Sequence, residues 1–178
     1  MNSRRLHAWV LVFCLAGAAV TAAPADAPAG SFVSGAFQTP PAPATLLIGG
    51  ALTARVSRVL GAAYPSREVA YWREKEKTVW ILEGRSKSYP FTAGFVVEGG
   101  RIAKSEILIY RESRGREIRS QRFLRQFTGA ALRDGAILDR RVDGITGATL
   151  SVEAAHKLAR LALVFDAFVC ERDVPADE

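Results

Sequence analysis

The sequence contains few of the residues that build disulfides and metal sites. It has two cysteines, Cys14 and Cys170, and two histidines, His7 and His156. Because Cys14 lies in an N-terminal apolar run that is expected to be removed, the mature chain keeps one thiol and cannot form an internal disulfide. Cys170 is expected to be a small buried hydrophobic residue. Neither histidine has neighbours at metal-ligand spacing, so no metal site is expected.

Long apolar runs are also scarce. The run Ala8–Ala23 has 16 residues, fewer than the roughly 20 that cross a bilayer. It follows Arg4 and Arg5 and ends in Val20-Thr21-Ala22, whose small residues are typical of a secretory cleavage site. Residues 1–22 are therefore predicted to be a signal peptide, with an uncleaved membrane anchor as the alternative. The protein is expected to be periplasmic or otherwise exported.

The remaining chain predicts a leader and one domain. Residues 23–45 are rich in Ala and Pro and are expected to form a flexible or partly extended leader. Residues 46–178 are expected to form the folded domain. Without residues 1–22 the chain has 22 basic and 18 acidic residues, a net charge of +4.

The periodicity of apolar residues predicts an α+β fold. A helix is expected over residues 46–63, ended by Pro65. Strands are expected over residues 69–72, 78–83, 92–98 and 102–110, the last two joined by a Gly-Gly hairpin turn. A short helix or turn at 121–127, a strand at 137–142 and a last helix over 151–169 follow. This order indicates an antiparallel sheet with flanking helices, the last of which packs on the sheet.

The most informative segment precedes the last helix. Residues 143–151 read Asp-Gly-Ile-Thr-Gly-Ala-Thr-Leu-Ser. A turn of small residues lets an anionic group approach the backbone, and the unpaired N–H groups at a helix start suit a phosphate. The simpler interpretation is an ordinary capped helix, with Ser151 as the N-cap and Glu153 in the first turn.

Read as a whole, the segment resembles the flavinylation motif of the FMN-binding domain family, Asp-x-x-(Ser/Thr)-Gly-Ala-Thr, and matches it at every specified position. The family includes the flavin-carrying C and G subunits of sodium-pumping quinone reductases and Rnf complexes, together with small secreted relatives. The resemblance implies an FMN-binding-domain-like fold and one FMN joined to Thr149 by a phosphoester bond. It also implies a separate flavin transferase that uses FAD as donor and Mg²⁺.

The resemblance gives the motif residues their expected roles. The Thr149 oxygen accepts the phosphoryl group, while Gly147 and Ala148 leave room for the transferase and the phosphate. Thr146 can donate a hydrogen bond to a phosphate oxygen. Asp143 orients the acceptor or helps to hold the metal during transfer; its alternative is an Asx-turn acid that bonds its own backbone. The cofactor-binding residues expected here are Asp143, Gly144, Thr146, Gly147, Ala148 and Thr149.

An arginine-rich run lies between residues 110 and 129. Its six arginines, against Glu112 and Glu117, are Arg111, Arg114, Arg116, Arg119, Arg122 and Arg125. One interpretation is a solvated basic face. A nucleic-acid patch is a second, against which export and the modest net charge argue. The third is a loop that contacts the flavin, followed by a surface that docks a redox partner.

The resemblance supports the third interpretation. In the membrane-complex members a Glu-Thr-Pro-Gly-Leu-Gly loop lies beside the flavin, and here the corresponding place holds Glu112-Ser113-Arg114-Gly115. The acid and a glycine are kept, but the proline and second glycine are not, which resembles the small secreted branch. An arginine near the pyrimidine end of the flavin stabilises the anionic reduced ring and raises its reduction potential. Arg111 and Arg114 are the candidates, and Glu112 is a further expected cofactor-binding residue.

Three aromatic residues, Trp72, Trp80 and Tyr110, are candidates for stacking on the flavin, with sheet core or cross-strand pairing as the ordinary alternative. The function expected from these features is electron transfer between redox partners, one of them a redox protein or membrane electron-transfer complex. The chain shows neither a nicotinamide-binding fingerprint nor a nucleophile–base pair, which argues against turnover of a small substrate by the chain alone. The alternatives are a flavin-dependent reductase of a diffusible acceptor and a non-redox exported adaptor.

Overall fold

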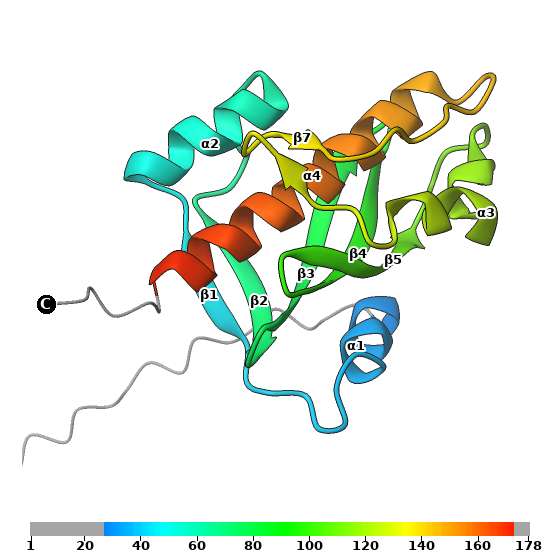
Figure 1. The fold of residues 1–178 in the computed structure, drawn as a ribbon. Coiled ribbons are helices and arrows are strands. Elements are labelled where there is room, and N and C mark those ends of the chain that lie inside the picture. The colour runs from blue at the N-terminus through cyan, green and yellow to red at the C-terminus, as the bar shows by residue number, and fades with distance from the viewer. Residues whose placement is uncertain (1–26, 173–178) are drawn as a thin grey trace, which may run out of the picture.

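A five-stranded antiparallel sheet forms the centre of the fold in the computed structural model, which describes residues 27–172 (Figure 1). The strands are β1 (Ala44–Leu47), β2 (Glu68–Glu74), β3 (Lys77–Arg85), β4 (Pro90–Glu98) and β5 (Arg101–Ile109), paired in that order. The expected α+β class with flanking helices is thereby confirmed. The predicted signal peptide and residues 23–26 of the predicted leader lie outside the described residues.

Four helices accompany the sheet. They are α1 (Ala27–Ser34), α2 (Gly50–Leu60), α3 (Gln121–Leu124) and α4 (Thr149–Arg172). The short 3-10 helices η1 (Arg116–Arg119) and η2 (Arg125–Phe127) flank α3, and β6 (Leu132–Arg133) pairs with β7 (Ile137–Leu138) in a separate two-stranded ribbon. Within residues 27–172, no helix combines the length and the apolar character that a membrane crossing requires.

The side chains of β3 alternate between the two faces of the sheet, as the period of two requires. Trp80 is fully buried in the larger core, where it stacks on Tyr71 at 4.8 Å between ring centroids and meets Phe165 of α4 at 5.4 Å. Val79, its neighbour, lies in a second cluster with residues of α1. The sheet is therefore covered by α4 on one face and by α1 on the other.

The strongest local signals are confirmed. Gly99 and Gly100 join β4 to β5 and have φ angles of 57° and 71°, which suit glycine because most residues with a Cβ avoid positive φ. The expected short helix at 121–127 is present as α3 and η2. The last helix begins two residues earlier than expected, at Thr149, and continues to Arg172. Cys170 on α4 is partly rather than fully buried.

Two boundaries near the start of the domain differ from the sequence prediction. The helix expected over 46–63 is confined to Gly50–Leu60, because Leu46 and Leu47 pair with Val69 and Glu68 as part of β1. Gly61, in the left-handed conformation with φ 74°, ends this helix before Pro65 does. The strand expected at 137–142 is likewise short, since only Ile137 and Leu138 pair.

The stretch expected to be a flexible or extended leader contains α1. Phe32 and Val33 of this helix, together with Phe37 after it, are buried against Val79 and Val96 of the sheet. The prediction of a flexible leader followed from the Ala- and Pro-rich composition and did not take into account these three apolar residues, whose burial anchors the segment. Described residues of the predicted leader thus belong to the packed domain.

Candidate cofactor cleft

The first turn of α4 has three free backbone donors. Ala148 occupies the N-cap position, and alanine has no side-chain oxygen with which to accept a hydrogen bond from the helix start. The N–H of Val152 donates to the Ala148 carbonyl at 2.9 Å, whereas the N–H groups of Thr149, Leu150 and Ser151 find no acceptor within residues 27–172. The positive end of a 24-residue helix is therefore left open to an anion.

Ser151 does not cap this helix, so the simpler interpretation of the segment is wrong for this residue. The side chain is buried inside the first turn, with its Oγ 2.7 Å from Ser86 Oγ and 2.9 Å from the Tyr110 hydroxyl. The Tyr110 hydroxyl donates to the Arg114 carbonyl at 2.8 Å. Because each hydroxyl has one proton, Ser151 donates to Tyr110 and Ser86 donates to Ser151. This chain of hydrogen bonds ties three segments together at the start of α4.

The loop after β5 packs closely against the motif. Gly115 has a φ of 76°, and a Cβ built at this position would lie 2.8 Å from the Tyr110 hydroxyl oxygen and 3.2 Å from the Ala148 Cβ. Only glycine allows both the backbone conformation and the close approach. The loop at Arg114-Gly115 can therefore lie this close to Ala148 only because Gly115 has no side chain.

Glu112 connects the loop after β5 to the turn between β3 and β4. Its carboxylate accepts hydrogen bonds from the backbone N–H groups of Ser88 at 2.7 Å and Tyr89 at 2.9 Å. These hydrogen bonds, first that from Tyr89 and then that from Ser88, hold the pKa of the carboxyl below its usual value, and the nearby Lys87 acts in the same direction. Glu112 thereby positions the turn between β3 and β4 beside the loop after β5.

These three segments enclose a cleft of about 580 Å³, within the size range of small-molecule sites. One wall is Ser86–Ser88, a second is Glu112–Arg114, and the third is Gly147–Ser151 at the start of α4. Thr149 is exposed in this cleft, so its hydroxyl is accessible to a modifying enzyme. Lys87 and Arg114 add two side-chain cations to the three free N–H groups.

The structure brings together part of the predicted site. Five expected cofactor-binding residues line the cleft: Glu112, Arg114, Gly147, Ala148 and Thr149. Four others, Asp143, Gly144, Thr146 and Arg111, are exposed and do not line it. The Asp143 N–H donates to Gln126 Oε1 at 2.8 Å, and its carboxylate lies 3.6 Å from Arg141 Nε. Asp143 is thus oriented by neighbours outside the cleft.

A second, more apolar cleft of about 480 Å³ adjoins the first and shares Ser86 and Leu150 with it. Its walls include Tyr64, Leu158 and Leu161, and Leu150 is half exposed at the boundary. Burial and a Coulombic effect of Glu83 raise the pKa of Tyr64 to about 12, so the phenol stays protonated at neutral pH. Trp72 and Trp80 line neither cleft; Trp80 is core, and Trp72 packs against the α1 cluster.

Several of these residues have no local signal in the sequence. Ser86, Lys87 and Ser88 reach the site because the β3–β4 turn lies over the first turn of α4, and no periodicity marks such a contact. Leu150 and Tyr64 look like ordinary apolar positions in the sequence.

Replacing Gly115 with alanine is expected to lower the free energy of unfolding by more than the cost of the left-handed backbone alone. The left-handed backbone costs about 1–2 kcal/mol for alanine, and overpacking against Tyr110 and Ala148 adds about 1–3 kcal/mol. Gly135→Ala is the matched control, because Gly135 has a φ of 70° but nothing within 4 Å of its Cβ position. Urea unfolding of both variants measures the difference. Equal losses would show that Gly115 is not pressed against the motif.

Comparison with models of known protein families, with curated proteins and with solved structures found no match to this chain.

Proposed function

We propose that this chain is an exported electron-transfer flavoprotein that carries one FMN esterified to Thr149. The observation that supports this most directly is the position of the Thr149 hydroxyl. It is exposed at the first residue of α4, in a cleft that also holds the Arg114 and Lys87 side chains. A hydroxyl, free helix N–H groups and two cations are the groups that a tethered phosphate requires.

The cleft fits the phosphate in charge as well as in geometry. Three backbone N–H groups without acceptors, from Thr149 to Ser151, are poised to bind phosphate oxygens. A serine or aspartate N-cap would occupy one of them, whereas Ala148 leaves all three available. Gly147 has a φ of 81° and no side chain, so the turn before the helix does not obstruct the approach. The absence of a cap is therefore consistent with a site reserved for a ligand.

The two adjoining clefts suggest how the cofactor is divided between them. The polar cleft suits the phosphate and the ribityl hydroxyls, and the apolar cleft across Leu150 suits the isoalloxazine ring. When bound, FMN supplies both one-electron and two-electron chemistry. Leu150, shared by the two clefts, would lie between the polar and aromatic parts, and the apolar wall that includes Leu158 and Leu161 would contact the ring.

Attachment is proposed to be a phosphoryl transfer catalysed by a separate flavin transferase with Mg²⁺. The Thr149 oxygen forms a bond to the FMN phosphorus of FAD, the pyrophosphate bond breaks, AMP leaves, and the hydroxyl proton is released. The exposure of Thr149 supports this, because a second protein must reach the hydroxyl. Asp143, outside the cleft and exposed, is proposed to act in the encounter with the transferase rather than on bound FMN.

A basic surface beside the cleft is proposed to receive the redox partner. Arg111, Arg114, Arg116 and Arg119 are all exposed on the loop after β5 and on η1. An acidic redox protein, or an acidic face of a membrane electron-transfer complex, would be steered to this surface at a rate that falls as ionic strength rises. A covalent tether suits such a carrier outside the cytoplasm, since a dissociating cofactor would be lost by dilution.

The Arg114→Glu substitution is expected to lower the reduction potential of the flavoprotein. The Arg114 guanidinium lines the polar cleft, so its charge would stabilise the anionic reduced ring from across Leu150, and a carboxylate at the same place would oppose it. A shift on the order of 30 mV corresponds to about 1.4 kcal/mol for a two-electron couple. Arg111→Glu makes the same charge change outside the cleft and is expected to have a smaller effect. Redox titration followed by flavin absorbance compares them; equal shifts would remove Arg114 from the cofactor site.

The apolar cleft also favours a second candidate, a flavin-dependent reductase of a diffusible acceptor. Its wall, which includes Tyr64 and Leu161, can accommodate a small apolar molecule beside a bound ring. Steady-state oxidation of the reduced flavoprotein by a small quinone, without any redox protein, would favour the reductase. Slow oxidation by the quinone, with fast oxidation by an acidic redox protein, would favour the carrier. Protein that stays colourless after co-expression with a flavin transferase would favour a non-redox adaptor.

A further inference from the structure

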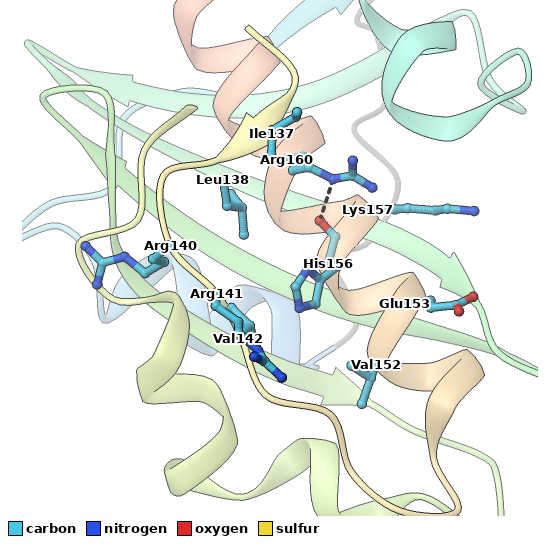
Figure 2. A pocket seen from close by; sticks show the side chains of 10 residues that line it. All are labelled: Ile137, Leu138, Arg140, Arg141, Val142, Val152, Glu153, His156, Lys157 and Arg160. Carbon is cyan, nitrogen blue, oxygen red and sulfur yellow. Dashed lines mark hydrogen bonds between the residues drawn. The ribbon is translucent and has the colours of Figure 1, made fainter. Parts of the chain in front are cut away.

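A third cleft lies between α4 and the segment from β7 to Val142, with a volume of about 380 Å³. It has no lining residue in common with the polar cleft around Thr149, whereas Glu153 and Lys157 also line the apolar cleft. Figure 2 shows its lining side chains arranged around His156 of α4. His156 and Arg160 line neither of the clefts assigned to the cofactor, so their part of this cleft has its own chemistry to explain.

The lining of this cleft is strongly basic. Its lining includes four cationic residues, Arg140, Arg141, Lys157 and Arg160, and one acid, Glu153. Ile137, Leu138 and Val142 provide an apolar wall beside them. An open cleft with this composition suits an anion that also has an apolar part.

Two of the four cations already have partners. Arg140 donates from its Nη1 to the Thr128 carbonyl at 2.7 Å and from its Nη2 to the Gly129 carbonyl at 2.8 Å. Figure 2 shows its guanidinium directed away from His156. Arg141 is almost fully exposed and lies 3.6 Å from the Asp143 carboxylate. Neither arginine is therefore the main anion-binding group of the cleft.

Arg160 is the cation whose charge is least well compensated. Its guanidinium is half buried, and burial lowers its pKa. Its hydrogen bonds go to two carbonyls, those of His156 and Ala136, both at a long 3.4 Å. Within residues 27–172 neither Arg160 nor Lys157 has a carboxylate within ion-pair distance. A partly desolvated charge without a counter-ion favours binding of an anion.

The pKa of His156 depends on the burial and the charges of this cleft. The imidazole is half buried, with its ring centroid 5.5 Å from that of Phe127 in an edge-on arrangement. Burial lowers the pKa of His156 first, and the Arg160 charge lowers it further, against a hydrogen bond with the Val142 backbone. The ring is thus neutral at pH 7. The other charged residues on the cleft wall are Lys157, Arg140, Arg141 and Glu153.

We propose that this cleft binds a small organic carboxylate, with the carboxylate on Arg160 and Lys157 and the apolar body on Ile137, Leu138 and Val142. The guanidinium offers paired N–H donors, which match a carboxylate in geometry as well as charge. Inorganic phosphate would satisfy the cations but leave the apolar wall without a contact. The proposal concerns a second ligand and does not depend on FMN at Thr149.

The experiment uses residues 23–178, in which His156 is the only histidine and gives a single imidazole signal in NMR spectra. Benzoate is the probe, benzyl alcohol is its uncharged counterpart, and inorganic phosphate is the anion without an apolar body. Bound benzoate is expected to raise the pKa of His156, because a nearby carboxylate favours the imidazolium. A saturable rise with benzoate, and none with benzyl alcohol, supports the proposal. An equal response to phosphate, or no saturable response to benzoate, overturns it.

Two variants separate binding from general charge. Arg160→Gln removes the cation, so the pKa of His156 in the free protein should rise toward its usual value while the apparent Kd for benzoate weakens about tenfold or more. Arg58→Gln, on the exposed face of α2, makes the same charge change elsewhere and should leave both quantities unchanged.

Lys157→Gln provides a second test if Arg160→Gln does not fold. Unchanged benzoate binding in Arg160→Gln or Lys157→Gln would refute the assigned carboxylate contacts. Repeating the titration in Thr149→Val, which lacks the proposed flavin attachment site, separates this site from the cofactor.

Discussion

Thr149→Val is expected to abolish covalent flavin attachment and leave the fold intact. Valine has nearly the shape of threonine but no oxygen with which to form the phosphoester. The side chain is exposed at the first residue of α4, so the free energy of unfolding should change by no more than about 0.5 kcal/mol. Co-expression with a flavin transferase, followed by intact-mass measurement, should give the parent chain plus FMN less one water. The variant should show only the bare chain.

Other hydroxyls near Thr149 make matched controls. Ser113→Ala removes another exposed hydroxyl of the same cleft, one outside the motif, and should still carry flavin. Thr149→Ser keeps an oxygen at the same place and should retain at least partial loading. Ser151 cannot replace Thr149 as acceptor, because it is buried and bonded to Ser86 and Tyr110. A flavin adduct that persists in Thr149→Val would assign the attachment to another residue, with Ser88 and Ser113 in the same cleft as the first to examine by peptide mapping.

Sequence patterns predicted the parts of the fold that local physics determines. The β4–β5 hairpin follows from two glycines between alternating apolar residues, and the structure gives both glycines positive φ angles. The last helix follows from its apolar stripe, which packs on the sheet and on α2. Its starting point was less predictable: Ser151 has the chemistry of a cap, but tertiary hydrogen bonds to Ser86 and Tyr110 bury it inside the first turn.

The candidate site was predicted only in part, again because tertiary contacts decide which residues meet. The motif and the loop after β5 were expected to lie beside one cofactor, and Thr149 and Arg114 do line one cleft. Arg111, on the same loop, is exposed and does not line the cleft. The third wall, Ser86–Ser88, depends on a contact between residues far apart in the chain, which no local pattern encodes.

Phe32→Ala is expected to lower the free energy of unfolding by about 3–5 kcal/mol, the range for removal of a large aromatic side chain from a core. The Phe32 ring is 4% exposed and packs on the face of the sheet opposite α4. A leader that was merely flexible would predict no measurable effect. Urea unfolding of the domain measures the change, and Ser31→Ala, an exposed neighbour on α1, should stay within about 0.5 kcal/mol of the parent.

The contact between Phe32 and Gly94 allows a sharper version of this test. A Cβ at Gly94 would lie 2.6 Å from the Phe32 ring, so Gly94→Ala should also destabilise the parent protein. In the Phe32→Ala background the space for that methyl group exists, and Gly94→Ala should cost much less. The two substitutions are therefore expected to be strongly non-additive, with a smaller combined loss than their sum. Additive losses of stability would mean that α1 does not pack on β4. A combined loss smaller than the sum would show that the described part of the predicted leader is a structural element of the domain that carries Thr149.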